Sequence, residues 1–393
     1  MNKSSPIDEK RLSVQHEIFS CVPLIDCLND FSNKNALYLP SAGNLGDALI
    51  GLGTLDLFEK LQLKFRTHDA VLFPKLPEVD YIVLGGSGGW FDGLWKHYAQ
   101  VLTPFFEKGG QALILPSTVS GFTEYFRKYA KQITVFARDP VSYEHLSSID
   151  ELKGRVFLCH DLAFAVDFSR LNPTPNLNKS GILNIFRQDE ESLHHEFYPN
   201  NYDFSLLWNG VSWYERETCE AKLKALVNIL DSFEEIHTDR LHMSVLATFL
   251  GANVAMYPGS YFKNEAIYNY SLVDFQNVRF CSEHPMGAVS MLAEEKLQKE
   301  NELEQLRKDY EFLNEELQET RYRNLLFAES LEGKNRGDYS AVQDLELEAF
   351  LNSKGYKVWN LYNSIYENKV VGPSLRKIRS LLGRLLRAIG IVK

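Results

Sequence analysis

The sequence of 393 residues is poor in cysteine and has neither long apolar runs nor an excess of basic charge. Its five cysteines are scattered and never spaced as C-x-x-C, so we expect no disulfide framework or zinc site, and a reducing compartment fits. No stretch approaches the roughly 20 apolar residues that span a bilayer, and the N-terminus lacks a signal-peptide core. The net charge of −10 argues against general nucleic-acid binding. We therefore expect a cytoplasmic protein without a nucleic-acid partner.

Several common catalytic motifs are missing as well. The glycine-rich segment 85–89 lacks the G-x-G-x-x-G order of a nicotinamide dinucleotide site, and no G-x-x-x-x-G-K-[ST] phosphate loop occurs. No G-x-S-x-G element indicates a serine hydrolase. Neither an H-x-x-x-H pair nor a Cys/His cluster indicates a catalytic metal. We expect no metal and no cofactor, so the chemistry should depend on side chains and backbone groups.

The sequence does contain a regular alternation of short apolar runs and helical segments. After a helical lead-in over residues 1–35, each apolar run ends in a polar or glycine-rich segment, and an amphipathic helix is expected after the first of them. The runs are 36–40, 81–84, 112–115, 133–136 and 156–159. Short buried strands that alternate with helices predict a parallel sheet covered on both faces. We assign these elements to a first Rossmann-like domain, residues 1–170.

A second set of α/β elements follows a Pro/Asn-rich linker over 171–176. It comprises an apolar run at 182–186, a helix over 218–230, a strand ending near residue 237, a helix over 241–250 and a strand at 253–257. We assign it to a second Rossmann-like domain, residues 177–290. Ligands of open α/β sheets bind beyond the carboxyl ends of strands, where the polar segments of both halves fall. The sequence therefore predicts two domains facing a cleft.

The last hundred residues differ in composition from the rest. Over 291–330, Leu303, Leu306, Tyr310, Leu313 and Leu317 follow a 3-4-3-4 spacing, which fits a single long helix or a short coiled coil that forms a homodimer. In the tail, residues 331–393, the segment 374–393 has six Lys/Arg and no acid, with apolar residues along one helical face. This pattern is typical of a helix that lies on an anionic membrane surface. The alternative is a helix that docks on the protein itself.

The turn at 238–242 has the combination of side chains that most clearly indicates a functional site. A strand ends just before it and a buried helix begins at Leu241, so Arg240 and His242 lie at a helix N-terminus, which suits an anion. A guanidinium binds phosphate or carboxylate through a bidentate fork, and an imidazole supplies a proton near neutral pH. The alternative is structural: Arg240 pairs with Asp239 or another carboxylate, and His242 is an ordinary helix residue.

Other candidates also follow predicted strands. The segment 43–47 allows a ligand to approach the backbone near Asn44, and Asp47 either caps the next helix or presents a carboxylate. Arg187 follows the strand at 182–186; its alternative role is a surface pair with Asp189 or Glu190. Asp92 ends the glycine-rich segment, and Lys263 follows the strand at 253–257.

Seven segments occur in the order seen in the polysaccharide pyruvyl transferase family, which this chain resembles. They are GNLGDALIGLG, VLGGSGGWFD, LPSTVSGF, FARDPVSYEHL, HDLAF, FRQDEES and TDRLHMSVLATFLG. The resemblance covers roughly residues 36–275. It implies two Rossmann-like halves similar to the glycosyltransferase-B architecture. It also implies transfer of pyruvate from phosphoenolpyruvate to a sugar diol, as a cyclic ketal, in cell-surface polysaccharide biosynthesis.

By motif, the resemblance places the family's phosphoenolpyruvate-binding arginines on Arg187 and Arg240 and its histidine on His242. It places an acidic residue on Asp92, although the glycine-rich exit here reads GGSGGWFD and not a simple G-G-G. The donor carries a phosphate and a carboxylate, so two arginines near a helix N-terminus suit it. Ketal formation needs an acid for the methylene carbon, for which we name His242. It also needs a base for a sugar hydroxyl, for which we name Asp92 or Asp47.

The remaining substrate-binding candidates are Asn44, Leu241 and Lys263, which lie in the same strand-end segments. A lipid-linked acceptor on the inner face of a membrane would connect this reaction with the basic tail, so we expect peripheral membrane association. Two other functions stay open. One is a nucleotide-sugar glycosyltransferase of the same architecture, which would need cationic groups for a diphosphate. The other is a membrane scaffold for polysaccharide assembly that has no activity of its own.

Overall fold

The computed structural model describes residues 5–68, 76–92, 96–171, 176, 178–193, 201–205 and 211–282. They belong to one compact unit, Met1–His284. The helix expected over 291–330 and the tail expected over 331–393 lie outside the described residues and stay predictions. The linker expected over 171–176 is described only at its two ends. The domain boundaries 1–170 and 177–290, and the glycosyltransferase-B-like arrangement, also stay predictions.

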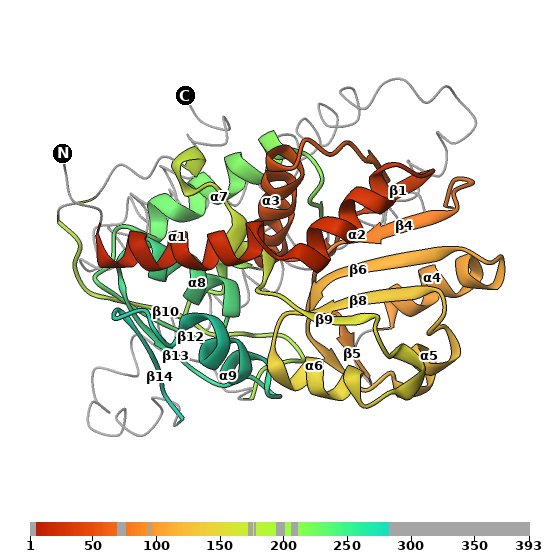
Figure 1. The fold of residues 1–393 in the computed structure, drawn as a ribbon. Helices are drawn as coiled ribbons and strands as arrows, with labels where there is room; N and C mark the ends of the chain where they lie inside the picture. Colours follow the sequence, from red (N-terminus) through yellow and green to blue (C-terminus); the bar gives the residue numbers. More distant parts are fainter. Residues whose placement is uncertain are drawn as a thin grey trace, which may run out of the picture. The chain divides into compact units, whose positions relative to one another are not determined.

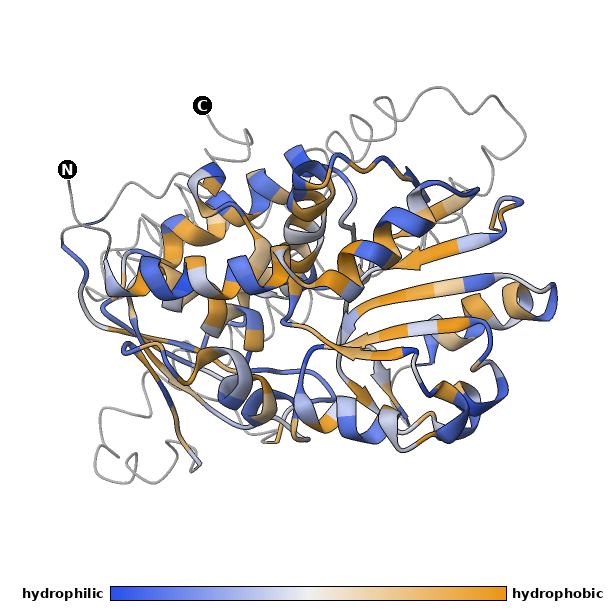
Figure 2. Cartoon of the chain, in the orientation of Figure 1, coloured by the Kyte–Doolittle hydropathy of each residue, from blue (hydrophilic) through white to orange (hydrophobic). Residues whose placement is uncertain are grey.

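The first main sheet has six strands, all parallel, in the order β3-β1-β4-β6-β8-β9 (Figure 1). In that order the strands are Arg66–Thr67, Ala36–Leu39, Tyr81–Leu84, Gln111–Ser117, Ile133–Ala137 and Val156–Leu158. The five apolar runs predicted for this half are all strands, to within three residues at either end. The inner strands are apolar because helices cover both faces of a parallel sheet, and Figure 2 shows them as hydrophobic ribbons.

The second main sheet has four parallel strands in the order β10-β12-β13-β14. They are Ile182–Ile185, Glu235–Thr238, Asn253–Met256 and Val278–Phe280. Two short pairs complete the strands: β11 (Val211–Ser212) runs antiparallel to β2 (Ala42–Gly43), and β5 (Trp90–Phe91) runs parallel to β7 (Val119–Ser120). The predicted α/β class with parallel sheets is confirmed.

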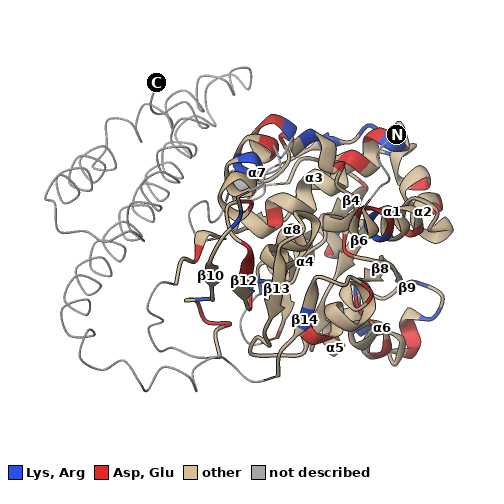
Figure 3. Cartoon of the chain, turned by 90° about the vertical axis from the view of Figure 1, so that its left-hand side faces the viewer, with Lys and Arg blue, Asp and Glu red and all other residues tan. Residues whose placement is uncertain are grey.

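Helices connect the parallel strands, as the sequence predicts. They are α1 (Pro6–Phe19), α2 (Val22–Ser32), α3 (Leu45–Lys60), α4 (His97–Glu107), α5 (Thr123–Lys128), α6 (Pro140–Ser147), α7 (Arg216–Leu230), α8 (Leu241–Phe249) and α9 (Lys263–Ile267). Short 3-10 turns cover Asp150–Leu152, Leu162–Ala165 and Phe168–Leu171, and a π turn, Tyr268–Leu272, follows α9. Helices α1 and α2 confirm the predicted helical lead-in. Outer helices carry both signs of charge, as α7 shows in Figure 3.

Helix α3 differs from the amphipathic helix expected at this position. Most of its residues are buried, on every side of the helix, because it contacts α7, α8 and the turn Leu162–Ala165. A helix that is apolar all round is a core helix. At Gly53 the approach is close enough that a Cβ atom would lie 1.8 Å from the Leu162 carbonyl oxygen. Arg216 of α7 also pairs with Asp56 of α3, which links the helices of the two halves.

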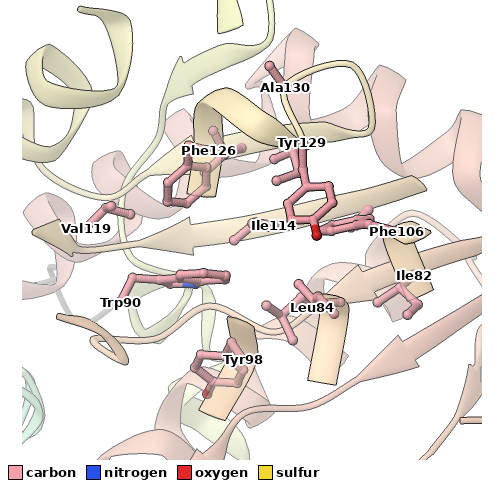
Figure 4. Close-up of a cluster of buried hydrophobic side chains, with 14 of the residues drawn as sticks. Ile82, Leu84, Trp90, Tyr98, Phe106, Ile114, Val119, Phe126, Tyr129 and Ala130 are labelled. Carbon is pink, nitrogen blue, oxygen red and sulfur yellow. The ribbon is translucent and has the colours of Figure 1, made fainter. Parts of the chain in front are cut away.

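A large apolar cluster underlies the six-stranded sheet (Figure 4). Within it, Trp90 lies between Phe126 and Tyr98, with its ring centroid 5.7 Å from that of Tyr98 and 5.2 Å from that of Phe126. Ile114 of β6 is completely buried in the same cluster. This packing fixes the strand ends that carry the site described below. None of the helices in the described part of the chain is both long and apolar enough to cross a bilayer.

We expect Ile114→Ala to lower the free energy of unfolding by about 2–5 kcal/mol, because it opens a cavity in the central strand of the sheet. Urea unfolding of the full chain measures this loss. Val141→Ala is the matched control, since Val141 is 42% exposed and its truncation leaves no cavity. Equal losses for the two variants would contradict the position of Ile114 in the core.

Candidate active site

Charged side chains from both sheets meet beyond the carboxyl ends of the parallel strands. The first sheet contributes Asp47 from the start of α3, Arg138 directly after β8 and Asp161 after β9. The second contributes Arg187 after β10, Arg240 and His242 after β12, and Lys263 after β13. Strand ends are where open α/β folds bind their ligands. The structure thus brings together most of the site residues that the sequence predicts.

The N-terminus of α3 lies directly against His242. Asn44 occupies the N-cap position, and its Oδ1 accepts a hydrogen bond of 2.8 Å from the Gly46 amide. A Cβ atom on Gly46 would lie 2.5 Å from Nδ1 of His242, so only glycine leaves room for the imidazole there. The side chain that caps α3 is therefore that of Asn44, and not that of Asp47, for which a capping role was weighed. The positive end of a 16-residue helix therefore faces the imidazole.

Asp161 joins Arg138 to His242. Its Oδ2 accepts a hydrogen bond of 2.7 Å from Nη1 of Arg138 and lies 3.4 Å from Nε2 of His242. Both Arg138 and Asp161 are 1% exposed. Burial opposes ionisation of Asp161, but the Arg138 guanidinium and the His242 imidazole outweigh it and hold the pKa of this carboxyl well below its usual range. Asp161 is therefore a buried anion that faces the histidine.

Lys263 brings a second cation to the same place. A Cβ atom on Gly88 would lie 3.0 Å from Nη2 of Arg138 and 3.6 Å from Nζ of Lys263, so both cations flank this glycine. Nζ also donates a hydrogen bond of 2.5 Å to Glu191. Burial lowers the pKa of Lys263 to about 8, although the Glu191 carboxylate acts in the opposite direction. Lys263 thus loses its charge only slightly above neutral pH.

Asp47 is a carboxyl group whose raised pKa suits proton transfer near neutral pH. It is partly exposed, in the first turn of α3. Burial raises its pKa to about 6, while the positive charge of His242, Arg138 and Lys263 partly offsets the effect. A carboxyl group with such a pKa exchanges protons close to physiological pH, as a general base or acid requires. Asp239, in the neighbouring turn, has its pKa raised by burial to about 7, but it is 2% exposed and its Oδ1 accepts the Arg187 amide.

Arg187 and Arg240 are both engaged by carboxylates. Arg240 forms a bidentate pair with Asp203, and its Nη1 lies 2.9 Å from Oδ2 of Asp189. Arg187 forms two hydrogen bonds to Asp189, of 2.8 and 3.0 Å, and its Nη1 lies 2.8 Å from Glu191. Both arginines are more than nine-tenths buried. This is the structural role weighed for Arg240, which pairs with Asp203 and Asp189 as the other carboxylates allowed for besides Asp239. For Arg187 the partners are Asp189 and the buried Glu191.

Asp92 lies apart from this group. It is exposed, at the end of β5, and its side chain packs against Gly121. None of the contacts found among the described residues joins it to His242. Leu241, by contrast, is buried as the first residue of α8. Its position in the turn is as predicted, but its side chain belongs to the core.

Four residues of the site were not assigned a role from the sequence: Arg138, Asp161, Glu191 and Asp203. Arg138 and Asp161 occur in two of the segments that carry the family resemblance, and each lies shortly after the end of a predicted strand. That position was the signal that could have identified them. Glu191 is in another of these segments, whereas Asp203 lies where the sequence shows no pattern.

The arrangement suits acid–base chemistry on an anionic substrate. The N-terminus of α3, Arg138 and Lys263 supply positive charge, and His242 and Asp47 supply groups that exchange protons. Phe91 and Tyr261 stack at 4.3 Å beside this group, with Nζ of Lys263 4.9 Å from the Tyr261 ring centre. Within the described ranges, no group of three or more His, Cys, Asp and Glu residues is arranged to hold a metal ion.

Comparisons with known proteins show what this chain is similar to. A crystal structure of an uncharacterized protein from Klebsiella pneumoniae subsp. pneumoniae NTUH-K2044 is similar to this chain, with 29% identity and a TM-score of 0.60. The match covers 67% of this chain and 98% of the Klebsiella chain. A search of curated proteins finds no match.

The family profile described as polysaccharide pyruvyl transferase matches residues 44–261, more than half of the chain. This range begins at Asn44, the N-cap of α3, and ends shortly before Lys263. It therefore contains every charged residue of the site described above except Lys263. Membership supports a transferase. The chain belongs to the polysaccharide pyruvyl transferase family.

Proposed function

We propose that this protein transfers pyruvate from phosphoenolpyruvate to a sugar diol, as a cyclic ketal, during biosynthesis of a cell-surface polysaccharide. The observation that carries the proposal is the position of His242. Its imidazole lies between the N-terminus of α3 and the buried Asp161, with Arg138 paired to the same carboxylate. This position beside positive charge supports His242 as the group that gives a proton to an anionic substrate.

Three groups suit the anionic ends of phosphoenolpyruvate. The first turn of α3, whose Gly46 amide is capped by Asn44, contributes the positive end of the helix dipole. Nζ of Lys263 and Nη2 of Arg138 both lie close to the backbone of Gly88, which brings the two cations to one place. We assign the phosphate and the carboxylate of the donor to these groups. Asn44 shapes the first turn of α3 and so belongs to the same receptor.

The reaction needs one acid and one base. His242 gives a proton to the methylene carbon of phosphoenolpyruvate, which becomes the methyl group, and the positive charge that develops at C2 accepts a sugar hydroxyl oxygen. Phosphate then leaves from C2, and the second hydroxyl oxygen takes its place and closes the ketal. Of the two hydroxyl protons, one replaces the proton that His242 gave and the other leaves with phosphate. Asp47 is the base, because its pKa of about 6 leaves it mostly ionised at neutral pH.

Arg187 and Arg240 remain predicted donor-binding residues, and the structure supports an additional role for them. Their carboxylate partners Asp189 and Glu191 are acidic groups of low pKa, because the attraction of nearby cations outweighs the burial that opposes ionisation. Glu191 in turn holds Lys263. We propose that these arginines keep the carboxylates ionised and so fix Lys263 in the donor site. Direct contact with the donor would require a guanidinium to exchange a carboxylate for the ligand.

The basic segment 374–393 stays a proposed membrane contact. It would hold the enzyme at the inner face of a membrane, where a lipid-linked sugar acceptor is accessible, and a homodimer through 291–330 would be compatible with it. Both segments lie outside the described residues, so this proposal rests on their charge and apolar pattern alone.

The function is tested by mass spectrometry of sugar acceptors after incubation with phosphoenolpyruvate. We expect a mass gain that corresponds to a pyruvate ketal, and a loss of turnover of roughly 100-fold or more in His242→Gln, which keeps a hydrogen-bonding group but cannot deliver the proton. Transfer of a glycosyl unit from a nucleotide sugar would establish the alternative enzyme class. If neither donor reacts while deletion of 291–393 disrupts polysaccharide assembly in cells, the scaffold function is correct.

The pH profile of kcat/KM should have an acid limb that is set by Asp47. Asp47 works as an ionised base, so activity falls as pH decreases through about 6, where the carboxylate is protonated. Lys263 binds the donor as a cation, so the affinity for phosphoenolpyruvate, measured by calorimetry, should fall as pH rises through about 8, where its charge is lost. Lys263→Arg keeps the positive charge to higher pH and should retain donor affinity above that pH. The same loss of affinity at alkaline pH in this variant would remove Lys263 from the donor site.

Arg240→Ala should lower the free energy of unfolding by about 3–5 kcal/mol, because it leaves Asp203 and Asp189 buried without their counter-charge. Chemical denaturation and donor titration by calorimetry are measured on the same variant. Arg279→Ala is the control, since Arg279 is an exposed partner of Glu235 and its loss should cost less than about 1 kcal/mol. Normal stability with lost donor binding would show instead that Arg240 binds the donor directly.

Deletion of residues 374–393 should release the protein from anionic vesicles while activity on a short soluble acceptor is retained. Each basic residue near such a surface contributes about 1 kcal/mol, so binding of the full chain should also weaken with salt. Vesicle co-sedimentation measures both effects. Binding that is independent of salt, or a truncated chain that aggregates, would mean that the segment packs on the protein.

A further inference from the structure

We propose that Asp161 is a positioning residue for His242: it holds the Nε2–H group of the imidazole and so assigns the transferable proton to Nδ1. The inference deepens the proposed function and rests on it for the identity of the reaction. The assignment of the ring nitrogens itself follows from contacts within the protein. Among the described residues Asp161 is the carboxylate with a hydrogen-bond contact to His242.

The protonation state of Asp161 determines whether the ring nitrogen of His242 that faces it carries a hydrogen. Its Oδ1 accepts the Ala163 amide at 2.7 Å, and its Oδ2 accepts Nη1 of Arg138 at 2.7 Å. With these donors and its pKa held below the usual range, the group is a carboxylate, which only accepts hydrogen bonds. The nitrogen that faces it must therefore carry the hydrogen, so Nε2 of His242 is the donor across the distance of 3.4 Å.

The other ring nitrogen of His242 is Nδ1. Nδ1 lies against Gly46 in the first turn of α3, where a Cβ atom would be only 2.5 Å away. When the imidazole is protonated, both nitrogens carry hydrogen, but the one on Nε2 stays with the carboxylate. The hydrogen on Nδ1 is not held by a carboxylate and is the one available to a donor bound at the edge of the first turn of α3. Asp47 in the same turn and Arg138 behind Asp161 are the other charged groups that bear on this equilibrium.

Asp161 is itself held in place by a chain of hydrogen bonds through Arg138. Arg138 is held by a second hydrogen bond, from Nε to Thr118 at 2.8 Å, and Thr118 in turn donates to Asp139 at 3.0 Å. All of these groups are almost completely buried. Because the ends of β6, β8 and β9 supply this chain of contacts, the histidine on α8 takes its orientation from the first sheet. Small movements between the two sheets would then change the direction in which Nδ1 points.

The direct test uses full-length protein labelled with ¹⁵N in histidine, with His242→Gln used to assign the signal. In the neutral form, we expect the wild-type protein to show hydrogen on Nε2 and a bare Nδ1, and Asp161→Asn to lose this preference. Hydrogen on Nδ1 in the wild-type protein would overturn the proposal. This readout needs no substrate, so it is independent of whether the proposed reaction is correct.

Kinetics provide the second test, once transfer of pyruvate by the wild-type protein has been shown. Asp161→Asn should lower kcat by about 100-fold or more, with a smaller change in KM for phosphoenolpyruvate, and should shift the alkaline limb of the kcat profile to lower pH, because the imidazolium has lost its counter-charge. Asp161→Glu, which restores the carboxylate, should recover part of the activity and the original limb.

Asp56→Asn is the matched control, since Asp56 is a buried aspartate that pairs with Arg216 and Arg170, on a different part of α3. It should lower stability without any shift in the pH profile. The same profile change in both aspartate variants, or a normal kcat in Asp161→Asn, would overturn the positioning role. If Asp161→Asn fails to fold, the ring-nitrogen assignment in the wild-type protein still decides the proposal.

Discussion

The buried ion pair between Arg138 and Asp161 is the contact on which the rest of the site depends. Two charges that are 1% exposed are stable only as a closely hydrogen-bonded pair, since an unpaired charge there would cost several kcal/mol. The pair fixes the ends of β8 and β9 relative to each other. Its carboxylate also faces His242, which follows β12 in the second sheet. One interaction therefore sets the alignment of the two strand ends and the electrostatic environment of the histidine.

A second group of ion pairs performs the corresponding task in the other sheet. Arg240 and Arg187 share Asp189, and Glu191 connects Arg187 with Lys263. Breaking one of these contacts exposes the next to an uncompensated buried charge, so the network is rigid as a whole. Burying these charges costs desolvation free energy, and apolar side chains would stabilise the same strand ends equally well. The ion pairs are therefore consistent with a functional role. The perturbed pKa values of Asp47 and Lys263 occur where the two groups meet.

The strand and helix pattern of this fold was predictable because it is local. Apolar runs of four or five residues and their polar exits identify the strands of a covered parallel sheet. Helix α3 was misjudged as amphipathic because its polar residues are few and its second covering layer comes from α7 and α8, far along the chain.

The candidate site was predictable only in part, for a related reason. His242, Asn44, Asp47 and Lys263 were identified because each lies at a strand exit, and they do meet in space. Arg138, Asp161 and His242 are separated by tens of residues, as the 23 and 81 positions between the bonded pairs show. No local pattern connects them. Asp203, one of the two carboxylate partners of Arg240, was equally hidden, because it lies in a segment without periodicity.

In the proposed reaction, this arrangement protonates the methylene carbon of phosphoenolpyruvate, and the product is a ketal. A reaction in D2O with phosphoenolpyruvate and a sugar acceptor, followed by mass spectrometry and NMR of the product, tests this directly. We expect a pyruvate ketal whose methyl group carries one deuterium from the solvent-exchanged acid. An enolpyruvyl ether without a methyl group, or a product without pyruvate, would contradict it.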